Sequence, residues 1–234
     1  MSMRLVVKYT KGEKVKYISH LDFMRLVQRA LRRAEIPVAY SKGFNPHPRL
    51  SFASALAVGT TSEGEYLEII LEKEMEPETL CHRMNEKLPE GIRFVKAVAI
   101  DDKAPSLMSV IERGEYLIHI SGMPDEGLDA VSVIEDFLNQ TEIFTIKKTK
   151  KGERHVDIRP MIHSIDIIAQ HQDGITIKAL LSTGSKANLR PEQLIEALLD
   201  FANISYSSEL LVQIHRLDLY LFEDGKWATP VEME

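Results

Sequence analysis

The sequence of 234 residues contains a single cysteine, Cys81, and no long apolar run. One cysteine excludes an intrachain disulfide and a thiolate metal cluster, and such sparse use fits a reducing compartment. No stretch approaches the roughly 20 apolar residues that cross a bilayer. The N-terminus also lacks the charged and apolar segments of a secretory signal. We therefore expect a cytoplasmic protein without membrane contact.

Signatures of nucleotide-driven or redox chemistry are missing as well. The sequence has no Walker loop, dinucleotide-binding fingerprint, nucleophile elbow or three-cysteine cluster motif. His20, His47, Cys81 and His82 lack the paired short spacing of a zinc site. We therefore expect no metal and no cofactor. The absence of a self-contained catalytic motif argues against an enzyme, but a His-based ribonuclease is left open.

The composition is that of a folded protein, but its charge is unevenly distributed. Hydrophobic residues make up 44% of the chain and charged residues 27%, which is ordinary for a globular protein. The first 50 residues hold 11 Lys and Arg against 3 Asp and Glu, whereas the remainder holds 18 against 32. Concentrated positive charge favours a localised anionic partner. The alternative is neutralisation by the acidic remainder across an intramolecular interface.

Hydrophobic periodicity predicts the elements of the first half. Strands are expected at 4–9, 65–71 and 93–100, an extended piece at 38–41, and helices at 19–34 and 77–87. In the first helix Ser19 and Asp22 form an S-x-x-D capping box. Its apolar face is expected to consist of Leu21, Met24, Val27, Leu31 and Ala34. The order β-α-β-β-α-β is typical of a ferredoxin-like unit.

The second half repeats this order with one additional strand. Strands are expected at 115–121, 143–148, 161–169, 174–181 and 210–222, and helices at 125–139 and 191–202. The segment 101–109 (DDKAPSLMS) has the composition of a linker. We therefore expect an α+β protein of two tandem ferredoxin-like (βαββαβ) units with antiparallel sheets, divided into 1–104 and 105–234.

The first helix carries a basic side opposite its apolar face. Arg25, Arg29, Arg32 and Arg33 lie within about a quarter-turn of one another at 100° per residue. The guanidinium fork matches the oxygens of a phosphate, so this side could bind RNA or another anion. The alternative is an ordinary solvated face.

The stretch from Ser41 to Arg49 (SKGFNPHPR) is the most unusual of the chain. Two prolines flank His47 and restrict the backbone on both sides, which fixes the direction of the imidazole. Gly43 permits a positive φ or the close approach of a partner backbone. The candidate RNA- or anion-binding residues are Ser41, Lys42, Gly43, Asn45, His47 and Arg49, with Phe44 or Phe52 as a stacking face. The alternative is a rigid connector.

Two further features complete the set of candidate sites. His20 is expected at a helix N-terminus, where the dipole lowers its pKa, so that His20 or His47 is a candidate general base. Its neighbour Asp22 fits a capping role better than a catalytic one. The stretch 147–159 (KKTKKGERHVDIR) predicts a protruding basic hairpin that could grip phosphates or be merely solvated. Its candidate RNA-binding residues are Lys147, Lys148, Lys150, Lys151 and Arg154.

The run from Tyr17 to Ile69, which contains YISHLDFMRLVQRALRRAEIPVAYSKGFNPHPRLSF, resembles a bacterial family of unknown function, the radical-SAM-linked domain proteins. The stretches VDIRPMI and Asn188-Leu189-Arg190-Pro191 extend the resemblance over most of the chain. The sequence departs from the family at 55–59, which lacks the usual proline. The resemblance implies a radical SAM protein as partner, and work related to RNA.

Three hypotheses follow. The leading one is an RNA-binding accessory module that presents a structured RNA, such as tRNA or rRNA, to a radical SAM enzyme. The second is a metal-independent endoribonuclease with His20 or His47 as general base and Lys42 nearby, by analogy with the tandem ferredoxin-like CRISPR RNA-processing enzymes. The third is a protein-docking domain that makes no RNA contact.

Overall fold

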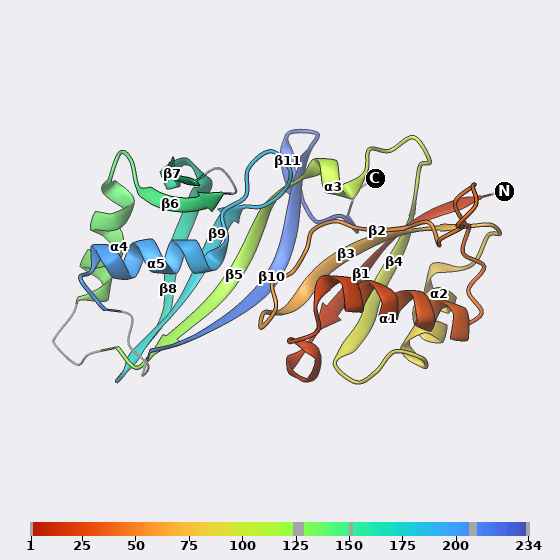
Figure 1. Ribbon diagram of the computed structural model, residues 1–234, viewed down its shortest axis with the longest axis horizontal. Coiled ribbons are helices and arrows are strands. Elements are labelled where there is room, and N and C mark those ends of the chain that lie inside the picture. Colours follow the sequence, from red (N-terminus) through yellow and green to blue (C-terminus); the bar gives the residue numbers. More distant parts are fainter. Residues whose placement is uncertain (1, 124–128, 150–151, 206–209, 233–234) are drawn as a thin grey trace. The chain divides into compact units, whose positions relative to one another are not determined.

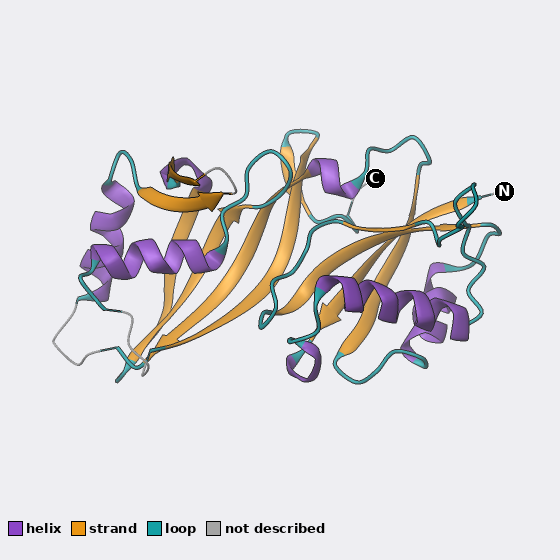
Figure 2. Ribbon diagram, in the orientation of Figure 1, coloured by secondary structure: helices purple, strands orange, loops and turns teal. Residues whose placement is uncertain are grey.

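The computed structural model describes residues 2–123, 129–149, 152–205 and 210–232 and has a mixed α+β fold (Figure 1, Figure 2). This confirms the predicted α+β class with antiparallel strands. The chain forms two compact units: unit 1 comprises Met1–Glu112 and Arg216–Glu234, and unit 2 comprises Arg113–His215. These bounds differ from the expected division at residue 104, because the last strand returns the chain to unit 1.

Unit 1 contains four long strands of sheet. Their order is β4 (Ile92–Ile100), β1 (Met3–Lys11), β3 (Thr61–Leu71) and β10 (Leu211–Glu223). Two strands of three residues pair at the side, β2 (Leu50–Phe52) with β3 and β11 (Lys226–Ala228) with β10. The pairs β1–β3, β1–β4, β2–β3 and β10–β11 are all antiparallel. The expected extended piece at 38–41 forms isolated bridges, Val38 with Leu71 and Tyr40 with Pro48.

Different helices cover the two faces of the sheet in unit 1. Helices α1 (His20–Arg33) and α2 (Pro77–Asn85) lie together on one face (Figure 2). Their core includes Leu5 and Val7 of β1 together with Leu67, Ile69 and Leu71 of β3. The short helix α3 (Leu107–Val110) formed within the expected linker packs on other side chains, Val6 and Tyr66. Because side chains alternate along a strand, β1 and β3 supply both faces.

The predicted apolar face of the first helix is correct for its later turns. Val27, Leu31 and Ala34 are buried, but Leu21 is 58% exposed. Phe23 takes its place, because its ring stacks on that of Tyr9 with centroids 5.3 Å apart. Positions 23, 27, 30 and 34 also follow the helical period, so the buried stripe is rotated in the first turn.

Buried polar contacts hold the returning strand β10 within unit 1. Nη1 of Arg216 donates to both carboxylate oxygens of Glu65, at 2.9 and 3.0 Å. Burial raises the pKa of Glu65, and the Arg216 guanidinium opposes that rise. Asp218 accepts from Lys8 at 2.6 Å and from the Tyr66 hydroxyl at 2.5 Å. Residues at opposite ends of the sequence therefore share one core.

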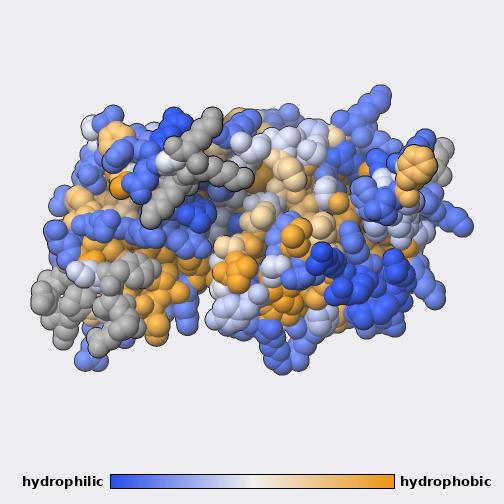
Figure 3. Space-filling model, viewed as in Figure 1, coloured by the Kyte–Doolittle hydropathy of each residue, from blue (hydrophilic) through white to orange (hydrophobic). Residues whose placement is uncertain are grey.

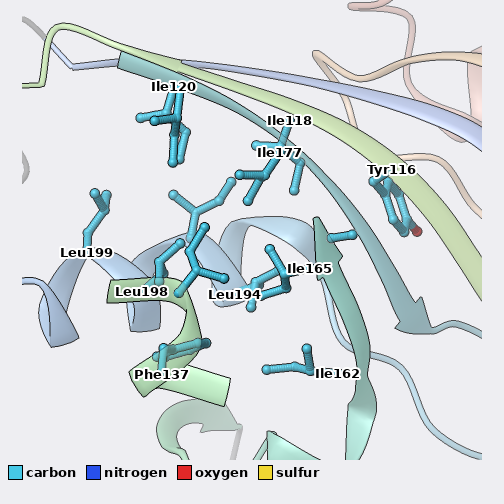
Figure 4. Packing of buried hydrophobic residues seen from close by; sticks show 14 of the residues in the cluster. Tyr116, Ile118, Ile120, Phe137, Ile162, Ile165, Ile177, Leu194, Leu198 and Leu199 are labelled. Atoms are coloured by element: carbon cyan, nitrogen blue, oxygen red, sulfur yellow. The ribbon is translucent and has the colours of Figure 1, made fainter. Parts of the chain in front are cut away.

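Unit 2 is built on an antiparallel sheet with two helices. Its strands run in the order β5 (Ile111–Ser121), β9 (Gly174–Ser182) and β8 (Ile162–His171). Helices α4 (Ala130–Asn139) and α5 (Pro191–Phe201) pack on it through residues such as Phe137, Leu194 and Leu198 (Figure 4). Strands β6 (Phe144–Thr149) and β7 (Gly152–Asp157) form a separate hairpin. Two 3₁₀ turns, Glu13–Val15 and Arg159–Met161, complete the described elements.

In the described parts of the chain, no helix is both long enough and apolar enough to span a membrane.

Replacement of Gly64 by alanine should destabilise unit 1. A Cβ at this position would lie 2.3 Å from the carbonyl oxygen of Leu217 and 2.5 Å from Cα of Asp218, so β10 would have to move. We expect Gly64→Ala to lower the free energy of unfolding by about 1–3 kcal/mol, measured by urea denaturation. Gly12→Ala is the matched control, since its Cβ would approach only to 3.4 Å. Equal stability of the two variants would contradict this packing.

Candidate functional site

The first turn of α1 is capped as the sequence predicts. Ser19 Oγ accepts from the backbone N–H of Asp22 at 3.2 Å, and its hydroxyl donates to the Asp22 carboxylate at 2.8 Å. The Ser19 hydroxyl, and then Arg25, lower the pKa of Asp22. Asp22 therefore stabilises the start of the helix and orients Arg25, with which it pairs at 3.2 Å.

The four arginines of α1 are all exposed, but they differ in their partners. Arg25 is held by Asp22, and Nη2 of Arg33 donates to the carbonyl of Lys87 at 2.7 Å, just beyond α2. Within the described residues, the side chains of Arg29 and Arg32 make no hydrogen bond or ion pair. The solvent side of α1 is strongly hydrophilic (Figure 3). Two of the four guanidinium groups therefore remain available to an anion.

The loop 41–49 is closed by a pair of residues at its base. The Ser41 N–H donates to the His47 carbonyl at 2.9 Å, and the His47 N–H donates to Ser41 Oγ at 3.1 Å. The His47 Nδ1 lies 3.0 Å from the same oxygen, so the imidazole direction is fixed. Gly43 has φ +134°, the positive φ that glycine permits. At the tip, Phe44 is completely exposed.

Beside this loop, unit 1 contains a polar cavity of about 580 Å³. It is lined by Ser2, Arg4, Ser41, His47, Pro48, Arg49, Leu50, Ser51, Glu68, Ile70 and Asp102. The cavity combines the predicted loop residues Ser41, His47 and Arg49 with strand residues that sequence reasoning missed.

Three of the missed residues, the buried Arg4 and Glu68 and the exposed Ser51, form a polar cluster. Nη2 of Arg4 donates to Oε1 of Glu68, and Ser51 Oγ donates to Oε2 at 2.9 Å. Arg4 also donates to the carbonyls of Ala104 and Pro105, at 2.5 and 3.1 Å. Arg4 and Glu68 interrupt otherwise apolar strands, RLVV and EYLEIIL, and this was the available signal. A charge at an inward position of a strand usually has a buried partner.

The cavity and the basic side of α1 lie on different faces of the sheet in unit 1. Glu68 alternates with Leu67 and Ile69, which pack under the helices. Its neighbours Arg4 and Ser51 are therefore on the face opposite α1. The loop and the helical arginines form two separate surfaces, not one continuous site.

The two candidate histidines are likewise separated. His20 is half-buried, with its ring edge-on to Phe52 at 5.2 Å between centroids, on the helical side of the sheet. His47 lines the cavity on the other side. The pKa of His20 is lowered, as expected. However, the cause is burial first and the charge of Lys11 second, rather than the helix dipole.

The remaining predicted residues are exposed or only partly described. Lys42 and Asn45 are exposed in the loop. In unit 2 the predicted basic hairpin is formed, with Lys147 and Lys148 in β6 and Arg154 exposed in β7. Lys150 and Lys151 lie outside the described residues. Across the described ranges, no three or more His, Cys, Asp or Glu residues are grouped so as to hold a metal ion.

Comparison with models of protein families identifies the family of this sequence. Residues 4–191 match the model described as an uncharacterized protein conserved in bacteria, DUF2344. The chain belongs to this family. The predicted resemblance to a bacterial family of unknown function is thereby confirmed, and the family description names no radical SAM partner.

Comparison with curated proteins yields no match. Among solved structures, a chain of a Cbf5-Nop10-Gar1 complex aligns with 92% of this chain at 10% identity and a TM-score of 0.50. A chain from an H/ACA RNP bound to a substrate RNA containing 2′-deoxyuridine aligns with 92% at 8% identity and a TM-score of 0.45. This chain spans about half of each, 48% and 46%. An unknown protein from Galdieria sulphuraria aligns over 92% of this chain and 99% of its own, at 10% identity and a TM-score of 0.26. At these identities the likeness concerns the fold alone.

The protonation of His20 provides a test of its surroundings. We expect its pKa, followed by NMR, to lie below the ordinary value of about 6.5. Lys11→Met should raise that pKa, because it removes the nearby positive charge. Lys14→Met is the control, since Lys14 is an exposed residue paired with Glu90. An unshifted pKa in the Lys11 variant would rule out the proposed electrostatic cause.

The same shift predicts a pH dependence of stability. Folded protein loses the His20 proton at a pH where the unfolded chain still holds it, so unfolding takes up a proton. The contribution of His20 is therefore fully present above its unfolded pKa and is lost as the pH falls through its folded pKa. Urea denaturation between pH 7.5 and 5.5 should show a smaller loss of stability for His20→Phe than for the wild type. The same pH dependence of stability in His20→Phe and the wild type would contradict the lowered pKa of His20.

Proposed function

We propose that this chain binds structured RNA through unit 1. The observation that carries the proposal is the pair Arg29 and Arg32, exposed on α1, whose side chains make no hydrogen bond or ion pair among the described residues. An arginine presents donors in a planar fork that fits two phosphate oxygens. Helix α1 is anchored by its buried apolar side, so that its guanidinium groups project from a rigid element.

The loop 41–49 offers a second kind of contact. The ring of Phe44 is completely exposed at the loop tip, and the exposed Lys42 lies two positions before it in the chain. An exposed aromatic ring next to a cation is the arrangement on which single-stranded bases stack, with typically about 1–3 kcal/mol per base. Asn45 and His47 would then orient the stacked nucleotide. This loop and α1 would bind different parts of one RNA around the edge of unit 1.

The scaffold proposed for this function is a tandem of ferredoxin-like units. In unit 1 the order β4-β1-β3, the pairing of β2 with β3, and the helices after β1 and β3 support this assignment. In unit 2 the element order β5-α4-β8-β9-α5, followed by residues 211–215 of β10, supports it, with the β6–β7 hairpin as an insertion. The second unit would add Lys147, Lys148 and Arg154 of its hairpin to the phosphate contacts.

The partner proposed for this RNA-binding module is a radical SAM enzyme that modifies or processes tRNA or rRNA. The support is the resemblance of SKGFNPHPRLSF and its flanking residues to the radical-SAM-linked proteins. The chain itself would supply RNA binding and no cofactor chemistry. The site then works by holding the RNA in one orientation while the partner reacts with it.

RNA binding should depend on the two unpaired arginines of α1. We expect Arg29→Ala/Arg32→Ala to weaken binding of total bacterial RNA about tenfold or more, because two phosphate contacts are lost. The slope of log K against log salt concentration should fall in magnitude by roughly 1.5. Filter binding at several salt concentrations measures both. The matched control is Arg93→Ala/Lys226→Ala, which removes the same charge from exposed positions on other elements of unit 1.

The other hypotheses are outcomes of the same experiment. Binding that does not respond to salt, or equal loss in the control variant, would contradict phosphate recognition by α1 and favour protein docking. Cleavage of labelled RNA by the purified chain in EDTA, abolished by His20→Ala or His47→Ala, would establish an endoribonuclease instead. Intact RNA with a retained salt response is the result that our proposal predicts.

A further inference from the structure

The cavity beside the loop is a polar space of unit 1, and the RNA contacts proposed above do not use its depth. At about 580 Å³ it lies in the range of small-molecule sites, about 300–1,000 Å³. Its lining residues differ in chemistry. They include a buried carboxylate, cationic and hydrogen-bonding side chains, and apolar side chains.

The carboxylate is that of Glu68, whose side chain is only 7% exposed. Arg4 donates to one of its oxygens and Ser51 to the other. A carboxylate can accept about four hydrogen bonds, so each oxygen retains one further acceptor position. Arg4 is itself committed to Glu68 and to backbone carbonyls. The pair therefore presents acceptors, not a free cation, to the cavity.

The loop supplies further polar residues of the lining, Ser41, His47 and Arg49. His47 is oriented through Nδ1 by Ser41, which leaves Nε2 for a ligand. Arg49 is exposed, and within the described residues its side chain makes no hydrogen bond or ion pair. Its backbone is fixed, since its N–H donates to Ala39 and its carbonyl accepts from Ile70. Such a guanidinium can take a phosphate without giving up an existing partner.

Pro48 and Ile70 supply the apolar surface of the cavity lining. A flat aromatic group can pack there, with its polar edge toward Glu68 and an anionic substituent toward Arg49. A nucleotide combines these three parts in one molecule. The flipped nucleotides of RNA- and DNA-modifying enzymes are bound in this way, through their Watson–Crick edge and faces.

We infer that the cavity binds a guanine nucleotide unit, with its base edge on Glu68 and its phosphate on Arg49 and His47. Guanine is the base whose N1–H and N2–H donors point in one direction, which matches the two oxygens of a carboxylate. Uracil places its single N–H between two carbonyls, and adenine and cytosine place an acceptor beside their amine. The inference deepens the proposed RNA-binding function and rests on it for the source of the nucleotide.

Isothermal titration of the full chain with GMP, AMP, UMP and inorganic phosphate tests the assignment. We expect GMP to bind roughly tenfold to a hundredfold more tightly than AMP or UMP, the effect of two hydrogen bonds to a charged acceptor. Glu68→Gln should abolish this preference, because its amide donates where the carboxylate accepts, and should leave phosphate binding intact. Arg49→Ala should weaken binding of all four probes.

Arg49→Ala and His47→Ala change exposed loop side chains, so they keep the test decisive if Glu68→Gln fails to fold. Equal affinity for the three nucleotides, or GMP binding unaffected by Arg49→Ala and His47→Ala, would overturn the inference. The variant Arg29→Ala/Arg32→Ala should bind GMP normally, because these arginines lie on the other face of the sheet.

Short RNAs that differ by one guanine-to-adenine change distinguish the source of the nucleotide. Tighter binding of the guanine-containing RNA, lost in Glu68→Gln, supports a guanosine within an RNA strand. Selective GMP binding by a chain that binds no RNA supports the cavity assignment with a free nucleotide as ligand, and overturns the proposed RNA-binding function. RNA binding that depends on α1 but shows no guanine preference overturns the cavity assignment and leaves the proposed function standing.

Discussion

The ion pair between Arg4 and Glu68 is the interaction on which the candidate site depends. It joins β1 to β3, and Ser51 of β2 and the carbonyls of Ala104 and Pro105 attach two further segments to it. Removal of one partner of a buried pair typically costs about 3–5 kcal/mol, whereas an apolar replacement of both is often neutral. Stability alone does not require a charged pair here. A functional reason for the charged pair is that it fixes a carboxylate in the lining of the cavity.

The alternation of side chains along β3 decides how the functional surfaces are arranged. Leu67, Ile69 and Leu71 face the helices and anchor α1, whose outer side then presents arginines to solvent. Tyr66 packs into the other core cluster, while Glu68 lines the cavity. One strand thus supports two chemically different surfaces, a basic helix and a polar cavity. An RNA that used both would have to pass around the edge of unit 1.

Much of the local structure could be predicted from the sequence because its signals are short-range. Ser19 marks the start of α1, and Pro77 and Pro191 mark the starts of α2 and α5. The strands followed from runs of apolar residues. The residue of the first turn of α1 that is buried could not be predicted in this way, because the burial of Phe23 depends on the ring of Tyr9 from another element.

The candidate site could be predicted only in part, for the same reason. The loop was recognisable from its prolines, glycine and histidine. Its relation to Arg4 and Glu68, 64 positions apart, depends on strand register that no local pattern specifies. The return of β10 to unit 1 rests on Glu65 and Arg216, 151 positions apart, and so the expected domain boundary differs from the structure.

The central claim is that unit 1 carries the RNA-binding surface, and ultraviolet crosslinking tests it most directly. The full chain would be irradiated in a bacterial lysate, and its RNA adducts mapped by mass spectrometry of the peptides. Our account predicts adducts on the peptides that contain Phe44 and the arginines of α1. Adducts confined to unit 2, or none above the level of an unrelated control protein, would contradict it.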